Sequence, residues 1–153
     1  MATIRIQRAT FDAGAESAAL TAGRGDIGAV VTFVGLCRDE GGALAALELE
    51  HYPGMAEEEM ARVVRLAEGR WPLMGVTVIH RVGRIAPGQP IVLVAVAAAH
   101  RGEAFAAAEM LMDFLKTRAP FWKRVLCADG AAGGWVEAKA NDEDSAARWS
   151  AAG

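Results

Sequence analysis

The sequence is constrained most by one uninterrupted apolar run, which covers residues 91–99. The run is far shorter than the roughly 20 residues that a membrane-spanning helix needs. It is rich in valine and apolar at every position, so it lacks the alternation of a half-exposed strand. A strand that is apolar on both faces is typical of the centre of a sheet. We therefore expect a soluble protein built around this central strand.

Weaker strand patterns occur on both sides of this run. Alternating or β-branched residues predict strands at 3–8, 27–36, 47–51, 76–82 and 135–139. Glycine-bearing loops at 38–42 and 83–88 interrupt them.

Three segments have the pattern of helices. The first begins at Met55 with glutamates in its first turn, where the helix dipole favours negative charge, and Pro72 ends it. Its predicted buried face consists of Met60, Val63, Val64, Ala67 and Trp71. A second helix is predicted over 103–117, with one face formed by Phe105, Ala108, Met112 and Leu115, and a charged helical tail is predicted over 141–149.

The strands and helices interleave without a regular βαβ rhythm, which favours an α+β fold. No repeat or linker divides the chain, so we predict a single compact domain over residues 1–153.

The composition excludes several classes of protein. Sixteen Lys and Arg against 19 Asp and Glu give a net charge of −3, which excludes a surface that is basic throughout for nucleic acid. The N-terminal residues lack the apolar core of a signal peptide, so we expect a cytoplasmic protein. Cys37 and Cys127 form no CxxC pair, and the three histidines are too scattered to complete a zinc site. We expect no metal and neither a nucleic-acid nor a membrane partner.

Basic residues give the strongest indication of chemistry. His100 and Arg101 follow the most buried strand and precede a helix, a junction at which a helix N-terminus favours an anion. Between Lys116 and Arg124 the chain carries four cations and no acid. Arg38, in the loop after another strand, could join them. This pattern indicates a site for a phosphate or a carboxylate, with a reactive lysine as a further possibility.

Each of these residues also has a structural explanation. Lys116 is predicted in the last turn of a helix, where a cation compensates the helix dipole. Lys123 and Arg124 beside Trp122 could form a solvated edge with a cation–π contact. His100 could be a hydrogen-bonded core residue. Structural roles are favoured for the histidines inside predicted strands, His51 and His80. The pattern alone leaves both explanations of the basic cluster open.

Six strings of residues resemble the large, catalytic subunit of molybdopterin synthase. They are GAVVTFVG (28–35), LEHYPGM (49–55), RWP (70–72), VTVIHRVG (76–83), AHR (99–101) and LKTRAPFWK (115–123). Each string alone is weak, but six in order between residues 26 and 149 are specific. On this resemblance the chain is identified as a member of that family.

The resemblance implies an α/β-hammerhead type of fold and a sulfur transferase. The family converts cyclic pyranopterin monophosphate into molybdopterin by installing two dithiolene sulfurs. Each sulfur arrives as a thiocarboxylate on the C-terminal Gly-Gly of a small ubiquitin-like sulfur-carrier subunit, whose tail enters a pocket of the large subunit. The resemblance also implies a homodimer with one small subunit at each end, forming a heterotetramer, and it implies no cofactor.

Matched residue by residue, the resemblance implies catalytic roles for Lys116 and Lys123, and substrate-binding roles for Arg38, His100, Arg101 and Met112. Fixed cations suit a cyclic phosphate. Two ammonium groups held close together favour the neutral amine on one of them, which can then act as a nucleophile or a base. Because the partner supplies the sulfur, the cysteines need no role. The alternative is a non-catalytic module that binds a ubiquitin-like tail or a phosphate, and the presence of both lysines favours the enzyme.

Overall fold

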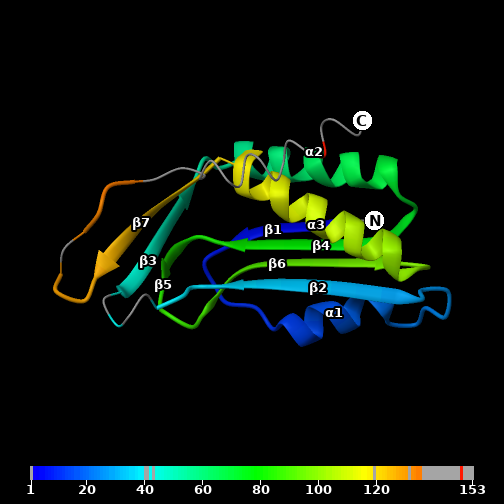
Figure 1. The fold of residues 1–153 in the computed structure, drawn as a ribbon, viewed down its shortest axis with the longest axis horizontal. Coiled ribbons are helices and arrows are strands. Elements are labelled where there is room, and N and C mark those ends of the chain that lie inside the picture. Colours follow the sequence, from blue (N-terminus) through cyan, green and yellow to red (C-terminus); the bar gives the residue numbers. More distant parts are fainter. Residues whose placement is uncertain are drawn as a thin grey trace.

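Two β-sheets and three helices form the described part of the chain in a computed structural model (Figure 1). The structure describes residues 2–39, 42, 44–118, 120–130, 132–135 and 149. In chain order the elements are β1 (Ala2–Gln7), α1 (Ala13–Thr21), β2 (Ala29–Leu36), β3 (Leu44–His51), α2 (Met55–Arg70), β4 (Leu73–Arg81), β5 (Gly83–Ile85), β6 (Pro90–Ala98), α3 (Arg101–Arg118) and β7 (Phe121–Cys127).

The larger sheet has four strands in the order β1-β4-β6-β2, so the apolar run lies in β6, between two other strands. β6 is antiparallel to both neighbours, and β1 is parallel to β4. Helices α2 and α3 cover one face of this sheet, and α1 covers the other (Figure 1). The prediction of a central strand is confirmed, and the cover on both faces explains why residues 92–98 are buried without a polar position.

The helix predicted from Met55 is α2, and most of its expected buried face is confirmed. The residues buried against the larger sheet and α3 are Met60, Val63, Val64 and Ala67. At the N-terminus the carboxylate of Glu57 accepts a hydrogen bond from the backbone N–H of Gly54 at 3.1 Å. This capping contact fixes the start of α2 close to the end of β3.

The second predicted helix is α3, and three of the four residues on its expected face are buried or half-buried: Ala108, Met112 and Leu115. The prediction that Phe105 lies on the buried face is wrong, because its side chain is 61% exposed. The buried residues of α3 are Ala104, Ala107, Ala108, Met110, Leu111, Phe114 and Leu115. Three buried alanines let the helix lie close to the sheet, and Phe105 is about 100° further around the helix than Ala104.

A smaller sheet of three strands, in the order β5-β3-β7, extends from one end of the larger sheet (Figure 1). The strand predicted at 47–51 is β3, but β5 and β7 were not predicted. β5 has three residues, which is too short for an alternation pattern, and cations interrupt the apolar residues of β7. Leu49 and Ile85 pack with Cys37 in a second, smaller core.

Helix α1 was not predicted either, because its sequence has only a weak amphipathic pattern. Its start is nevertheless encoded, since the carboxylate of Asp12 accepts a hydrogen bond from the backbone N–H of Ala15 at 3.0 Å. Within the part of the chain that the structure describes, no helix is long and apolar enough to cross a membrane.

The two predictions for the C-terminal segment are largely untested. Trp135 is not in a strand, and the rest of the strand predicted at 135–139 lies outside the described residues. The tail predicted over 141–149 also lies outside them, apart from Trp149. The indole N–H of Trp149 donates a hydrogen bond to Asp113 at 2.6 Å, and its ring packs edge-on against Trp71. Trp149 therefore contacts the residue that follows α2 and a side chain of α3.

A buried arginine links the ends of three strands of the larger sheet. Arg81, at the end of β4, is 6% exposed. Its Nε and Nη2 donate to the carbonyl oxygen of Arg8 at 3.1 and 3.0 Å, and its Nη1 donates to the carbonyl oxygen of Pro90 at 3.0 Å. Arg8 directly follows β1, and Pro90 begins β6, so one guanidinium fixes the end of the sheet that faces the smaller sheet.

Replacing Arg81 with methionine is therefore expected to lower the free energy of unfolding by about 3 kcal/mol, since hydrogen bonds to a charged group are lost. Urea unfolding measures this as a lower midpoint at an unchanged m-value. Arg84→Met, at an exposed position of β5, is the matched control and is expected to change the free energy by less than about 0.5 kcal/mol. Equal losses in the two variants would contradict a specific role for the buried guanidinium.

Candidate active site

The two lysines predicted to be catalytic lie where the two sheets meet. Lys116 is exposed in the last turns of α3, and Lys123 is half-buried near the start of β7. Only residues 119–120 connect the two elements, so the chain passes from helix to strand at once. Figure 1 shows the end of α3 leading directly into β7 of the smaller sheet, and the two lysines belong to these two segments.

Phe121, which lies between the lysines in the sequence, is stacked against two imidazoles. Its ring centroid lies 3.8 Å from that of His80, with the planes 13° apart, and 6.2 Å from that of His51, with the planes 28° apart. His80 belongs to β4 of the larger sheet, whereas His51 and Phe121 belong to β3 and β7 of the smaller one. This stack of three rings joins the two sheets at the start of the strand that carries Lys123.

The imidazole of His80 is uncharged at neutral pH. Burial is the main cause that lowers the pKa of His80 to about 4. Its Nδ1 lies 2.8 Å from the carbonyl oxygen of Arg81, and this hydrogen bond opposes the shift. The charges of His51 and Lys116 lower the pKa of His80 further, so both groups are within electrostatic range of its ring. The lysine site thus contains an aromatic ring that adds no positive charge.

The pairing of β3 with β7 places Lys123 on the same face as Phe121. Phe121 lies opposite His51, and Lys123 lies opposite Leu49, across the antiparallel pair. Side chains directly opposite each other share a face of the sheet. Because Leu49 is buried in the second core, the stem of Lys123 lies beside apolar side chains and not in open solvent.

Arg124 lies on the other face of β7. Its Nη2 donates to the carboxylate of Glu48 at 3.1 Å, and its guanidinium lies 4.7 Å from the ring centroid of Trp135. The cation–π contact considered for Arg124 is therefore present, but its aromatic partner is Trp135 and not Trp122. Trp122 packs edge-on against Tyr52 instead.

His100 and Arg101 are exposed at the opposite end of α3. At a rise of about 1.5 Å per residue, the helix separates Arg101 from Lys116 by about 22 Å. The chain before His100 is tightly placed, because a Cβ atom at Gly28 would lie 2.1 Å from the carbonyl oxygen of Ala99. One chain therefore does not bring His100 and Arg101 into the same small-molecule site as the lysines.

Arg38 and Met112 lie toward the lysine end of the molecule. Arg38 is exposed just after β2, whose last residue pairs with Pro90 at the start of β6, whereas His100 follows the end of β6. Met112 is half-buried against the main core, one turn before Lys116 on α3. The structure thus groups four of the six predicted residues at one end: Arg38, Met112, Lys116 and Lys123.

The ring stack was not predicted from the sequence as part of this site. It favoured structural roles for His51 and His80, and it gave Phe121 no role. The available signal was the family resemblance, because the strings at 49–55, 76–83 and 115–123 each contain one of the three rings.

Both cysteines are free thiols. Cys37 is buried, its sulfur lies 3.7 Å from the carbonyl oxygen of Ile85, and burial raises the pKa of the thiol. Cys127 is half-buried at the end of β7. A thiol that stays protonated is a poor nucleophile, which fits the absence of a predicted role for Cys37.

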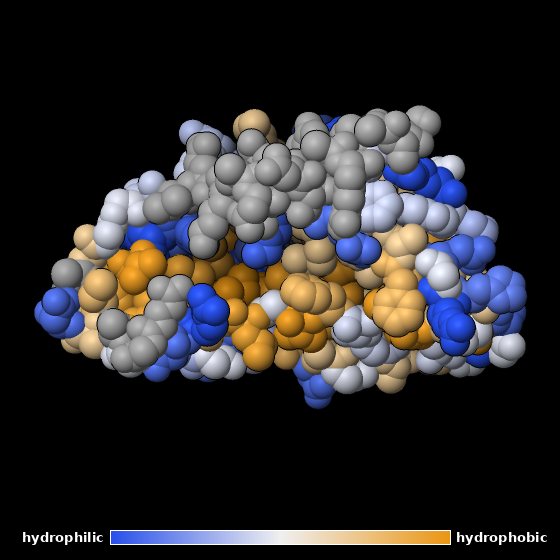
Figure 2. Space-filling model, in the orientation of Figure 1, coloured by the Kyte–Doolittle hydropathy of each residue, from blue (hydrophilic) through white to orange (hydrophobic). Residues whose placement is uncertain are grey.

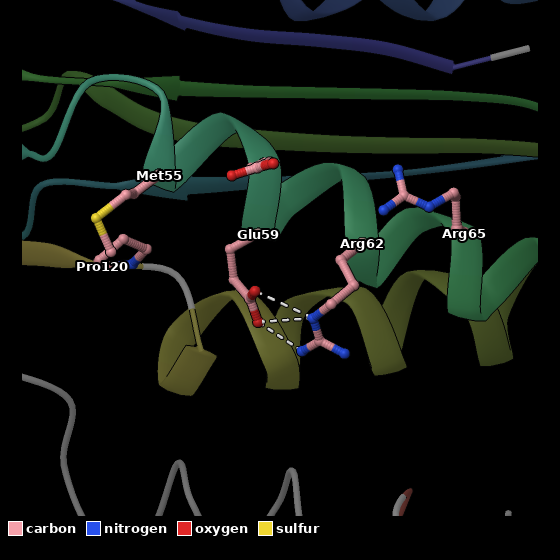
Figure 3. Close-up of a pocket in the computed structure, with 6 residues that line it drawn as sticks. Met55, Glu59, Arg62, Arg65 and Pro120 are labelled. Carbon is pink, nitrogen blue, oxygen red and sulfur yellow. Dashed lines mark hydrogen bonds and ion pairs between the residues drawn. The ribbon is translucent and has the colours of Figure 1, made fainter.

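A shallow groove of about 340 Å³ lies beside the lysine site, on the outer side of α2 (Figure 3). Its lining residues are Met55, Glu58, Glu59, Arg62, Arg65 and Pro120. Figure 3 shows Met55 reaching toward Pro120, and the Glu59–Arg62 ion pair lying along the helix. The groove contains none of the six predicted residues and touches the lysine segment only at Pro120, so the chemistry is better placed at the sheet junction.

The comparisons with known proteins agree on one family. The family model described as MoaE protein matches residues 6–118. A curated relative from Mesorhizobium japonicum, named molybdopterin synthase catalytic subunit, is 65% identical over 147 residues, which cover 96% of this chain and 92% of the relative.

Solved structures agree with this match. A molybdopterin biosynthesis MoaE protein from Burkholderia ambifaria is similar with a TM-score of 0.84 at 50% identity, over 98% of this chain and 99% of that one. A chain in the complex of subunits 1 and 2 of molybdopterin-converting factor from Helicobacter pylori has the same fold, with a TM-score of 0.68 at 22% identity over 90% of each chain.

Proposed function

The chain belongs to the MoaE protein family, and we propose that it is the catalytic subunit of a molybdopterin synthase. In this role it uses the C-terminal thiocarboxylate of a small ubiquitin-like subunit to install sulfur on cyclic pyranopterin monophosphate. The observation that carries the proposal is the position of Lys116 at the end of α3 and of Lys123 near the start of β7, with Phe121 between them in the sequence and stacked on the neutral ring of His80.

The proposed reaction needs proton transfer or an acyl acceptor, and it needs a fixed anion site. A lysine amine can accept a proton or attack the acyl carbon of the thiocarboxylate as sulfur leaves. The cationic groups of His100, Arg101 and Arg38 can hold the cyclic phosphate through charge-assisted hydrogen bonds. Lys116 and Lys123 supply the proton acceptor or the nucleophile. His100 and Arg101, the exposed pair at the start of α3, supply the anion site.

We propose that a homodimer completes the site, because α3 separates these two groups by about 22 Å in one chain. A two-fold axis that sets α3 antiparallel to its copy brings His100 and Arg101 of one protomer to the lysine end of the other. β2 is an edge strand of the larger sheet, and the exposed apolar residues on it and on α3 are Phe33, Leu36 and Phe105. Figure 2 shows apolar surface over this region, which supports a contact between copies here.

The second proposed partner is the small sulfur-carrier subunit. The Helicobacter pylori chain of the same fold is part of a two-subunit complex, which supports this partner for the present chain. In this proposal the partner supplies the thiocarboxylate, and the burial of Cys37 supports a sulfur source outside this chain.

Reconstitution tests the proposed function. Purified protein, thiocarboxylated small subunit and the cyclic pterin are expected to form the dithiolene product together, and the protein alone is expected to form none. Cys37→Ala combined with Cys127→Ala is the control and is expected to keep most of the activity. Tight binding of the small subunit without any product would instead support the non-catalytic module, and product formed without the thiocarboxylate would contradict the proposed sulfur source.

Arg101→Ala is expected to weaken binding of the cyclic pterin by about 1.5–3 kcal/mol, the range for a hydrogen bond to a charged group. Isothermal titration with the pterin measures this loss. Binding of the small subunit, measured in the same way, is expected to change little. If the variant instead lost the small subunit and kept its pterin affinity, the anion site would be assigned to the wrong ligand.

A further inference from the structure

We propose that the stacked rings of His51, Phe121 and His80 are a positioning device that fixes Lys123 and Lys116 relative to each other. The proposal rests on the function proposed above, because it assigns a purpose to the stack within the same site. In this proposal the three rings hold the lysines in place and do not contact the substrate themselves.

The first argument is the connectivity of Phe121. It lies two residues before Lys123 on the same face of β7, and five residues after Lys116. A ring stacked against imidazoles from β4 and β3 therefore restrains the segment that carries both lysines. Neither α3 nor β7 alone supplies this restraint, since β7 is an edge strand that pairs with β3.

The second argument is the way each imidazole is held. The Nδ1 of His80 donates to the carbonyl oxygen of Arg81, which fixes the plane of the ring against Phe121. The Nε2 of His51 lies 3.9 Å from the carboxylate of Glu57, which also caps α2. The stack is thus tied to β4 on one side and to the start of α2 on the other.

The third argument is charge. The flat ring next to Lys116 must not add a cation, because a further positive charge would oppose the binding of anionic groups. A histidine that is neutral at working pH satisfies this condition, and its hydrogen bond supplies an orientation that phenylalanine lacks. The buried Nδ1 of His51 has no hydrogen-bond partner among the described residues, so the contribution of His51 to the stack comes mainly from the face of its ring.

The test compares His80→Ala, His80→Phe and Val78→Ala. Val78 is fully buried on β4, two residues before His80, and it is not one of the stacked rings, so its truncation costs stability and leaves all three rings present. Removing the ring of His80 is expected to lower kcat by about tenfold or more, since small misplacements of reacting groups are costly, while KM for the pterin changes little. His80→Phe keeps a stacked ring but loses the hydrogen bond to the carbonyl oxygen of Arg81, so it is expected to recover only part of kcat. Val78→Ala is expected to lower the melting temperature and leave kcat near the wild-type value.

A second measurement reports the geometry without turnover. A short bifunctional aryl fluoride joins two amines that lie close together, and mass spectrometry quantifies the Lys116–Lys123 product. Wild-type protein and Val78→Ala are expected to form it, and His80→Ala is expected to form about tenfold less. If His80→Ala does not fold, Phe121→Leu, which keeps apolar volume and loses the flat ring, takes its place with the same expected results.

The proposal is overturned if His80→Ala loses no more kcat than Val78→Ala, or if the cross-link yield is the same in all variants. The failure of the proposed function is distinguishable from this result. In that case the wild-type protein forms no dithiolene product, while the dependence of the cross-link on His80 still tests the positioning role.

Discussion

Replacing Lys116 with alanine is expected to lower turnover of the cyclic pterin by at least about a hundredfold, the scale on which a group that transfers protons or forms a covalent bond acts. The fold should be unaffected, because Lys116 is exposed and surface substitutions usually change the free energy of unfolding by less than about 0.5 kcal/mol. A single-turnover assay with thiocarboxylated small subunit measures the loss, and unchanged thermal unfolding confirms that the protein is intact.

Arginine at the same position separates chemistry from charge. Lys116→Arg is expected to be as inactive as Lys116→Ala, since a guanidinium stays charged and is not a nucleophile. At Lys123 we expect a difference between the two variants: Lys123→Arg is more active than Lys123→Ala, because the arginine keeps a supporting positive charge. Near wild-type turnover by Lys116→Arg would show that Lys116 acts only through its charge.

The second large effect is expected when two inactive variants are mixed. One carries Lys116→Ala, and the other carries His100→Ala together with Arg101→Ala. If each site takes its lysines from one protomer and its anion-binding pair from the other, half of the randomly mixed dimers contain one intact site. The mixture is then expected to recover about a quarter of the wild-type activity, although each variant alone is inactive at low pterin concentration.

The control for this experiment mixes Lys116→Ala with Lys123→Ala. Both lysines come from the same protomer, so no exchange of chains restores an intact site, and activity should stay at the level of the single variants. Recovery in this control, or no recovery in the first mixture, would contradict a site shared across the dimer in the proposed way.

The sequence was informative where one local pattern determines structure. The run at 91–99 could only be a central strand, and the spacing of Met60, Val63, Val64 and Ala67 indicated the buried side of α2. It was uninformative where tertiary contacts determine structure. β7 is a strand because β3 lies beside it, and the exposure of Phe105 depends on how closely α3 approaches the sheet.

The same division applies to the candidate site. The basic residues could be recognised from the sequence, first as a charge cluster and then through the family resemblance. Their separation could be predicted as well, because Arg101 precedes the helix predicted over 103–117 and Lys116 lies in its last turn. The ring stack, in contrast, was hidden, since His51, His80 and Phe121 come from three strands in two sheets.

The pairing of β3 with β7 also has a consequence for how the protein is made. Glu48 and Arg124, which pair across these strands, are 76 positions apart in the chain. During synthesis β3 therefore cannot pair with β7 until most of the chain has left the ribosome. In contrast, β4 and β6 can pair early because they are close in sequence. Closure of such a long loop is slow compared with local pairing. Lys123 thus reaches its place in one of the last steps of folding, so a partly synthesised chain holds the larger sheet before it holds the lysine pair.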